Sequence, residues 1–238
     1  MSDTEIPLEG GQMTPGIVRI GNTVRRPMTD GAPFRHSMLK MLEDRGYPHA
    51  PRFLGVDDRH REILTYFEGE IVRNGEGYSD DALAEVASML RKLHDAISGS
   101  VLCKGSEVVC HNDIAPWNTV MSDGKPVAFI DFDAAEPGDR LDDIGYMLWT
   151  FLNLGTEADT QRVFRRFDLM LDAYELRSRT GLATAILGRQ HRLLNWRQHL
   201  ADSAEDADVR DRSAQRVLEV REQIAWVTRH AHTISSNR

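Results

Sequence analysis

The sequence predicts an α+β fold with two lobes, a small β-rich lobe followed by a larger, mainly helical one. Short β-prone runs separated by turns fill the first third of the chain, and from Ser79 onward apolar residues follow a helical period. Because strands come first and helices later, the two kinds of element are segregated. We place the boundary where glycines and charges cluster, between Gly69 and Gly77, which gives lobes of residues 1–69 and 70–238.

The first lobe is expected to hold four strands and one helix. Gly21-Asn22 is a strong two-residue hairpin signal between two β-prone runs. Met38, Leu39 and Leu42 have helical spacing, and the helix that they indicate ends at Gly46. The predicted strands span residues 17–20, 23–26, 52–56 and 62–67, and the predicted helix spans residues 34–45.

The second lobe is expected to begin with a helix capped by Ser79. Asp80 and Asp81 follow in the first turn, where carboxylates face the positive end of the helix dipole. A strand pair between residues 108 and 133 interrupts an otherwise helical pattern. The apolar stripes of the helices are Leu83, Val86, Ala87, Leu90, Leu93 and Ile97; Val163, Phe164, Phe167, Met170, Leu171 and Tyr174; and Val217, Ile224, Val227, Ala231 and Ile234.

The composition disfavours several classes of protein. The chain has 238 residues, 41% hydrophobic and 28% charged, which is a globular balance. Its net charge of −8 disfavours binding to nucleic acid or to an anionic membrane, because phosphates would be repelled. The N-terminus does not resemble a signal peptide, and the longest apolar stretch, residues 146–154, is about half as long as a bilayer span. Cys103 and Cys110 lack metal-site spacing and fit reduced thiols in a cytoplasmic protein.

One segment carries most of the chemical information. His111, Asp113 and Asn118 precede a predicted hairpin, and Asp131 follows it. If the turn centres on Gly124-Lys125, Val120 lies opposite Phe129, and Asn118 lies opposite Asp131. The hairpin would then bring an amide oxygen and a carboxylate together, and Mg²⁺ prefers such hard oxygen ligands. Asp113 would lie close enough to accept a proton from a substrate hydroxyl.

This segment resembles a known family. The spacing His111-x-Asp113-x₄-Asn118 is similar to the catalytic loop of protein kinases. Asp131 within I-D-F-D, and Asp143 within the following G-D-x-x-D-D, resemble the aminoglycoside-phosphotransferase and choline-kinase branch. The alternative is a polar loop between core strands, with Asn118 and Asp131 as turn residues.

The resemblance implies a protein-kinase-like bilobal fold and transfer of phosphate from ATP to a hydroxyl of a small molecule. It implies that Asp113 is the catalytic base or orients the hydroxyl, and that Asn118 and Asp131 bind Mg²⁺. His111, grouped with Asp113 among the catalytic residues, would brace the loop. Asp143 would anchor the loop through backbone N–H groups.

The first lobe departs from the family, whose members have a strand lysine that binds the α- and β-phosphates. The corresponding strand here has arginines instead. By the period-2 alternation of a strand, Val24 would cover the adenine and Arg26 would reach the phosphates, with Arg25 as the alternative. A solvated arginine on an edge strand is the other interpretation. The helix glutamate that pairs with the lysine has no clear counterpart, since its position falls near Arg35 or His36.

Three further features are predicted, two on the nucleotide side and one at a helix end. Residues 64–69 resemble the interlobe linker, in which the backbone near Thr65 and Phe67 would hydrogen-bond the adenine; an ordinary strand end is the alternative. Gly10-Gly11 could close over the phosphates or form a plain turn. His94 is expected to pack at a helix end, near the negative end of its dipole.

The phosphate acceptor is expected to be a hydroxylated small molecule bound by the second lobe. Acidic residues between 201 and 211, with Glu157 and Asp159, could receive a cationic acceptor, or could be solvated residues at helix N-termini. Trp149, Trp196 and Trp226 could form an aromatic cage for an ammonium group or belong to the core. The sequence leaves the oligomeric state open.

Two other functions were weighed against this small-molecule kinase. The alternative is a pseudokinase-like module that binds ATP with vestigial catalysis, because the usual lysine and glutamate are absent. The complete set of Asp113, Asn118 and Asp131 argues against it. A protein kinase is disfavoured, because no D-F-G, activation segment or A-P-E follows Asp131.

Overall fold

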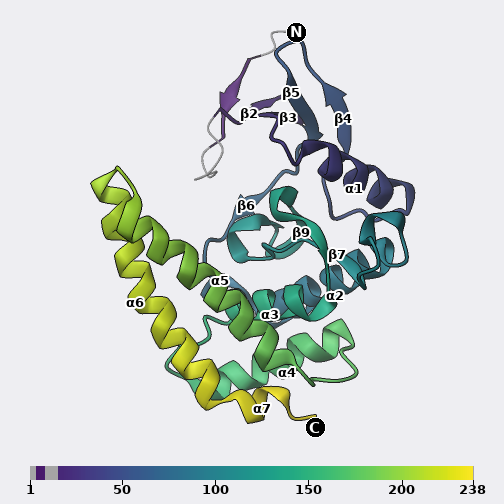
Figure 1. The fold of residues 1–238 in the computed structure, drawn as a ribbon. Helices are drawn as coiled ribbons and strands as arrows, with labels where there is room; N and C mark the ends of the chain where they lie inside the picture. The colour runs from purple at the N-terminus through teal and green to yellow at the C-terminus, as the bar shows by residue number, and fades with distance from the viewer. Residues whose placement is uncertain (1–3, 9–15, 238) are drawn as a thin grey trace.

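The computed structural model describes residues 4–8 and 16–237 of the chain. A small antiparallel sheet with one helix forms the first lobe, and a mainly helical lobe lies below it in Figure 1. The predicted α+β bilobal fold is therefore confirmed. Gly10-Gly11, proposed to close over phosphates, lies outside the described residues.

The first lobe is built on a five-stranded antiparallel sheet with the order β1-β2-β3-β5-β4. Gly21, at φ 57°, makes the tight turn between β2 and β3, as the hairpin signal predicted. The strands are β1 (Ile6–Pro7), β2 (Val18–Ile20), β3 (Thr23–Pro27), β4 (Phe53–Val56) and β5 (Arg61–Thr65).

Helix α1 (Ala32–Asp44) packs its apolar face into the core of the molecule. Met38, Leu39 and Leu42 are almost fully buried, as their spacing predicted. Gly46 follows with φ 72°, a conformation that glycine adopts readily after a helix end.

Two smaller sheets carry the middle of the chain. One has the order β6-β8-β9, and the other pairs β7 with β10, all antiparallel. Sequence analysis predicted strands between residues 108 and 133 but not β6 or β10. The strands are β6 (Glu70–Ile71), β7 (Val108–Cys110), β8 (Thr119–Ser122), β9 (Lys125–Phe129) and β10 (Glu136–Gly138).

The predicted register of the β8–β9 hairpin was wrong by one residue. Thr119, not Val120, lies opposite Phe129, and Asn118 is paired with Ile130 through its carbonyl rather than with Asp131. The physical reason is the turn combined with a β-bulge. Asp123 and Gly124 both have positive φ, 51° and 74°, which is the conformation of a two-residue primed turn, so the turn centres one residue earlier and would by itself move each partner by two residues. An irregularity between Val120 and Met121 restores one of these residues.

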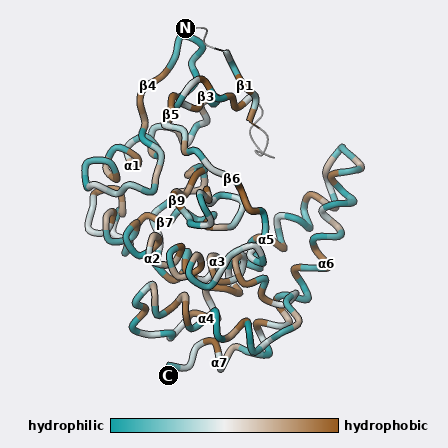
Figure 2. Tube along the Cα trace, turned by 180° about the vertical axis from the view of Figure 1, so that it is seen from behind, coloured by the Kyte–Doolittle hydropathy of each residue, from teal (hydrophilic) through white to brown (hydrophobic). Residues whose placement is uncertain are grey.

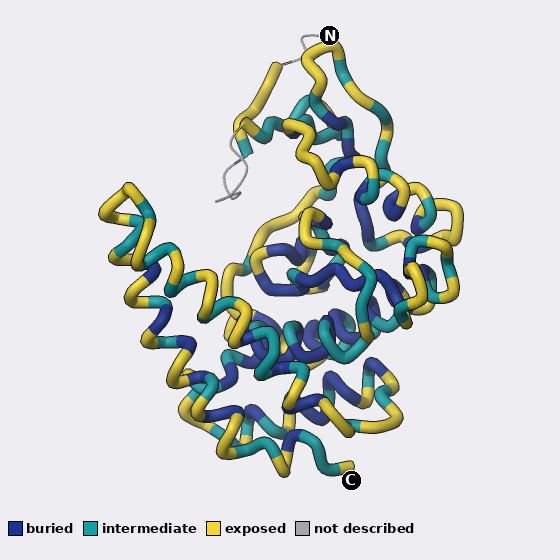
Figure 3. Tube along the Cα trace, in the orientation of Figure 1, coloured by how far each residue is buried: buried dark blue, intermediate teal, exposed yellow. Residues whose placement is uncertain are grey.

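Helices make up most of the second lobe. The Oγ of Ser79 accepts a hydrogen bond from the N–H of Ala82 at 3.1 Å, which confirms the predicted N-cap of α2. Figure 3 shows that buried residues concentrate where α2 and α3 pass beneath the small sheets. The helices are α2 (Asp80–Ile97), α3 (Arg140–Phe151), α4 (Thr160–Tyr174), α5 (Leu182–Ser203), α6 (Ala207–Arg229) and α7 (Ala231–Ser235).

The predicted apolar stripes lie where expected. All six stripe residues of α2 have no exposed surface, and the stripe of α4 is buried except for the partly buried Phe164. The long α5–α6 hairpin differs, because its far end projects from the body of the molecule and is largely hydrophilic (Figures 1 and 2). Its base joins the core through residues such as Ile186 and Val227.

Two glycines lie at the junction of the lobes. A Cβ atom at Gly69, which has φ 152°, would overlap the backbone carbonyl of Met121, and one at Gly75 would overlap the backbone carbonyl of Phe151. The chain therefore passes directly against β8 and the end of α3. The next residue after Gly69, Glu70, pairs with Met121 in the second lobe. The boundary at residue 69 stays a prediction.

Two further features concern possible membrane-spanning helices and the cysteines. Within residues 4–8 and 16–237, no helix is long and apolar enough to cross a membrane. Cys103 and Cys110 are both buried and free, in line with the expected thiols.

Candidate active site

The predicted catalytic loop runs from the end of β7 to a single 3₁₀ turn, Pro116–Asn118, and a buried carboxylate fixes its start. Asp143 of α3 accepts hydrogen bonds from the backbone N–H groups of His111 and Asn112, both at 2.7 Å. Asn112 has φ 66°, which turns both N–H groups toward this carboxylate. The expected anchoring of the loop by Asp143 is confirmed.

The Asp143 carboxyl group is held in its ionised form. Burial would raise its pKa, but the hydrogen bond from His94 and the one from the Asn112 N–H lower the pKa below 3.8. His94 is fully buried, with Nε2 3.0 Å from Asp143 and Nδ1 2.7 Å from the Tyr174 hydroxyl. His94 is therefore a packing residue, as expected, and it also supports the anchor.

His111 links the loop to the strand that precedes Asp131. Its Nδ1 accepts the backbone N–H of Asp113 at 3.2 Å, and its Nε2 lies 3.1 Å from the carbonyl oxygen of Ile130. Because Nδ1 accepts, Nε2 carries the proton and donates it to the carbonyl. These are the contacts of a brace, and a direct catalytic role of His111 stays a prediction.

Asp113 is held by two donors. Its Oδ2 accepts from Asn118 Nδ2 at 2.6 Å, and its Oδ1 accepts from the Tyr146 hydroxyl at 2.8 Å. Burial and the neighbouring Asp113 charge raise the pKa of Tyr146, so its hydroxyl stays protonated and donates. Sequence reasoning missed Tyr146, although its position one helical turn after Asp143 was a signal.

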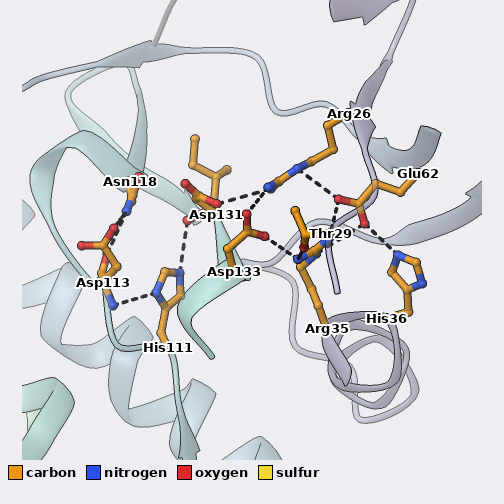
Figure 4. Close-up of polar contacts among 11 residues, drawn as sticks. Arg26, Thr29, Arg35, His36, Glu62, His111, Asp113, Asn118, Asp131 and Asp133 are labelled. Carbon is orange, nitrogen blue, oxygen red and sulfur yellow. Dashed lines mark hydrogen bonds and ion pairs between the residues drawn. The ribbon is translucent and has the colours of Figure 1, made fainter. Parts of the chain in front are cut away.

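Asn118 and Asp131 reach the same cavity, although they are not opposite each other in the hairpin. Asp131 follows β9 in a left-handed conformation, φ 65°, and its side chain is 45% exposed. Figure 4 shows Asn118 directly above Asp113, and Asp131 between Asn118 and Arg26. Both residues line a cavity of about 320 Å³ between the lobes.

This cavity contains the nucleotide-side residues that the sequence predicted. Val24, Arg26, Thr65 and Phe67 all line it, and Arg25 does not. Arg25 points to the other side of the sheet, where its Nε lies 3.7 Å from Asp57. Other lining residues were not predicted, because they come from separate turns and strand ends: Leu8, Ile17, Pro51, Ile71, Arg73, Trp117, Val120 and Ile130.

Arg26 reaches across the cavity from β3 to the second lobe. Its Nη1 lies 3.3 Å from Asp131 Oδ1, its Nη2 pairs with Asp133, and its Nε lies 3.1 Å from Glu62 Oε1 without hydrogen-bond alignment. Burial would lower the pKa of Arg26, but the charges of Asp133, Asp131 and Glu62 raise it. Arg26 therefore stays cationic although only 5% of it is exposed.

A network of ion pairs replaces the usual pair of a strand lysine and a helix glutamate. In this network the helix carries a positive charge, and the carboxylate lies on a neighbouring strand. Glu62 lies on β5 directly opposite Arg26 and is fully buried. On α1, Arg35 donates to Glu62 at 2.8 and 3.3 Å and also pairs with Asp133, and His36 lies 2.7 Å from Glu62. Helix α1 thus supplies Arg35 where the usual pair has a glutamate, β3 supplies Arg26, and β5 supplies the carboxylate (Figure 4). Sequence reasoning located Arg35 and His36 but missed Glu62.

The features proposed for a cationic acceptor have structural roles. Asp206 caps α6 by accepting from the backbone N–H groups of Asp208 and Val209, and Asp159 caps α4. Trp149 and Trp226 are buried in the core, at 3% and 8% exposure, so an aromatic cage with Trp196 does not form.

The oxygen donors at the cavity fit Mg²⁺. Among the described residues, no group of three or more His, Cys, Asp or Glu side chains could hold a metal by itself. Magnesium does not require such a group, since it is commonly bound through one or two side-chain oxygens together with phosphates and water. The donation of Asn118 Nδ2 to Asp113 leaves its amide oxygen free, and Asp131 is partly exposed to the cavity.

Comparison with known proteins identifies the family. The profile described as "Phosphotransferase enzyme family" matches residues 99–177, which include the catalytic loop and Asp143. The trifolitoxin immunity protein of Rhizobium leguminosarum bv. trifolii is 32% identical, over 98% of this chain and 96% of its own length. This chain belongs to the phosphotransferase enzyme family.

Solved structures share the fold of this phosphotransferase. The streptomycin–ATP ternary complex of APH(2″)-IIa superposes with a TM-score of 0.60 at 14% identity, covering 93% of both chains. A choline/ethanolamine kinase family protein from Mesorhizobium loti gives 0.58 at 14% identity, covering 89% of this chain and 88% of that one. The enzyme class expected from the sequence, a small-molecule phosphotransferase with a hydroxyl acceptor, is that of this family.

Proposed function

We propose that this phosphotransferase transfers the γ-phosphate of ATP, with Mg²⁺, to a hydroxyl group of a small molecule. One observation carries the proposal. Asn118 hydrogen-bonds Asp113 on one side and lines the interlobe cavity together with Asp131 and Arg26 on the other. A hydroxyl-binding carboxylate, hard oxygen ligands and a cation thus converge at one place, as phosphoryl transfer requires.

Asp113 would orient the acceptor hydroxyl and accept its proton. The hydrogen bonds from Asn118 and Tyr146 fix both oxygens of the carboxylate. Neither donor is charged, so the carboxylate is not neutralised by an ion pair and remains able to take a proton in the transition state.

Asn118 and Asp131 would hold Mg²⁺ through one amide oxygen and one carboxylate. Bound there, the metal would neutralise charge that develops on the transferred phosphate. Arg26 would contact the phosphates from the opposite wall, since guanidinium groups bind phosphate oxygens in pairs. In this structure Arg26 contacts Asp131 directly. Binding of Mg²⁺ to Asp131 and of phosphate to Arg26 would replace that contact.

The nucleotide base would lie between the lobes. Val24 lines the same cavity as Arg26, two residues along the strand, and provides an apolar cover for adenine. Thr65 ends β5 and Phe67 lies beyond it, so the backbone of this linker would offer hydrogen bonds to the adenine edge. The ATP complex of a protein with this fold supports ATP as the phosphate donor.

The test is release of ADP in the presence of Mg²⁺ with a panel of acceptors. The panel contains aminoglycosides, choline, homoserine and amino sugars, together with trifolitoxin, because a relative is named for immunity to it. Turnover that is lost in Asp113→Ala and kept in Arg25→Ala supports the proposal. Binding of ATP without turnover on any acceptor would instead favour the pseudokinase-like alternative.

A further inference from the structure

Four arginines of the α5–α6 hairpin form a group that begins at the catalytic loop. This arginine cluster consists of Arg189, Arg197, Arg212 and Arg216. The Nη1 of Arg189 donates to Asn112 Oδ1 at 2.9 Å, and its Nη2 donates to the Asn112 carbonyl. The guanidinium also lies 4.7 Å from the centre of the Tyr146 ring, whose hydroxyl donates to Asp113. One end of the cluster is therefore next to the site of the acceptor hydroxyl.

The cluster continues from this loop along the two packed helices. Arg212 and Arg216 lie one turn apart on α6, which packs along α5, and the positive charge of Arg216 acts on both the Tyr146 hydroxyl and Arg197. Burial, followed by the charges of Arg216 and Arg212, lowers the pKa of Arg197. Two neighbouring guanidinium groups thus act directly on the half-buried Arg197.

Negative partners for these charges are scarce. Among residues 4–8 and 16–237, Arg189, Arg197 and Arg212 form no ion pair, and Arg216 pairs only with Glu219, at 2.8 Å. The buried Nε of Arg197 has no hydrogen-bond partner, although its guanidinium lies 4.5 Å from the Trp196 ring centre. Like charges held together without counter-charges destabilise a fold. A bound anion would supply the negative charge that these arginines lack.

Other arginines of the same hairpin have ion-pair or hydrogen-bond partners. Arg192 lies 3.6 Å from Asp142, and Arg221 donates to Gln198 at 3.2 Å. Arg210 donates to two backbone carbonyls near the turn between the helices. Arg210 and Arg221 thus have neutral partners only, as Arg189 does; the cluster differs in its place beside the loop of Asn112 and in the buried, unpartnered Nε of Arg197.

We propose that the arginine cluster is a subsite for a negatively charged group, a carboxylate or a phosphate, carried by the acceptor whose hydroxyl lies at Asp113. The inference rests on the proposed function and narrows its substrate class to a hydroxylated acid. Arginine forks match carboxylate and phosphate oxygens in pairs, which suits both groups. A polycationic acceptor would be repelled from the same surface.

The test uses three sugars that share a hydroxylated ring and differ in charge: glucuronate, glucose and glucosamine. Their binding is measured on the full chain saturated with Mg²⁺ and AMP-PNP, a non-hydrolysable ATP analogue that keeps the probes out of the nucleotide site. Glucuronate is expected to bind most tightly. The ratio of the glucose Kd to the glucuronate Kd should fall about tenfold in Arg197→Gln and in Arg212→Gln.

Arg221→Gln is the matched control, because it removes the same charge from an exposed position on the same hairpin but outside the cluster. It should leave glucuronate binding unchanged. Arg212 is exposed, so Arg212→Gln keeps the test valid if Arg197→Gln does not fold.

Several results would overturn the subsite: equal binding of the three sugars, preference for glucosamine, no binding of glucuronate, or equal weakening by the control. Binding of AMP-PNP is the separate readout. A wild-type chain that does not bind AMP-PNP contradicts the proposed function, whereas AMP-PNP binding without preference for glucuronate contradicts only the arginine subsite.

Discussion

The two walls of the interlobe cavity are held in place by different kinds of interaction. In the second lobe, Asp143 holds the catalytic loop through backbone N–H groups, and His111 bridges the loop to the backbone at Ile130. In the first lobe, Arg26, Arg35 and Glu62 hold one another through side-chain ion pairs that extend to Asp133.

This difference explains why one wall is easy to recognise in a sequence and the other is not. A loop held through its backbone depends on the spacing of residues along the chain, so a short motif describes it. A side-chain network depends only on where charges meet in space. Here Glu62 of a strand contacts both Arg26 and Arg35, and the helix residue in the network, Arg35, is a cation where the usual pair has a glutamate.

The largest effect is expected from Asp113→Asn, which tests the second-lobe wall. Asparagine fills the same volume but cannot accept the hydroxyl proton, so turnover should fall roughly 10²–10⁴-fold while the fold is kept. ADP release and circular dichroism check both expectations. Asp123→Asn, at the other end of the hairpin, is the control and should keep full activity. Wild-type turnover in Asp113→Asn would exclude Asp113 as the base.

Asp143→Ala should produce the largest loss of stability. It leaves the buried His94 and two backbone N–H groups without their acceptor, so the free energy of unfolding should fall by about 3–5 kcal/mol. Urea denaturation measures this. Asp142→Ala removes a partly exposed carboxylate next to it and should cost less than about 1 kcal/mol. Similar losses in the two variants would show that the hydrogen bonds of Asp143 stabilise the fold no more than its partly exposed neighbour does.

Arg26→Ala tests the first-lobe wall. Loss of a charge-assisted contact to phosphate should raise the Michaelis constant for ATP about tenfold or more, with a smaller effect on the rate of chemistry. Steady-state kinetics at varied ATP separate the two effects. Arg25→Ala, on the opposite side of the sheet, should leave both unchanged. If Arg25→Ala has the larger effect, the assignment of the phosphate-binding arginine is reversed.

The smallest effect concerns acid stability. Because the folded state lowers the pKa of Asp143 below 3.8, its ionisation stabilises the protein fully above that value, and this contribution is lost as the pH falls through the lowered pKa. The unfolding free energy should therefore decrease on acidification. Urea titrations at several acidic pH values should show a shallower decrease in Asp143→Asn, and an identical slope in both proteins would contradict the expectation.

Much of the fold and half of the site could be predicted from sequence. The helical stripes and the Ser79 cap follow from local periodicity and spacing, and the anchor at Asp143 follows from the family resemblance. The hairpin register did not, because Asp123 joined Gly124 in a left-handed turn that a residue other than glycine adopts less often. Glu62 and Tyr146 were missed for another reason. Each acts on a residue from a distant segment, and the only local signal was the position of Tyr146 one helical turn after Asp143.

The glycines at the lobe junction have a consequence for how the two lobes move. Glycine-rich connections are usually taken as flexible hinges, but Gly69 and Gly75 are required because neighbouring carbonyls leave no space for a side chain. The connecting chain therefore packs directly against the second lobe at these two residues. Any opening of the lobes to admit ATP would have to bend the chain before Gly69, between the end of β5 and that residue, and even an alanine at position 69 would alter how far they close.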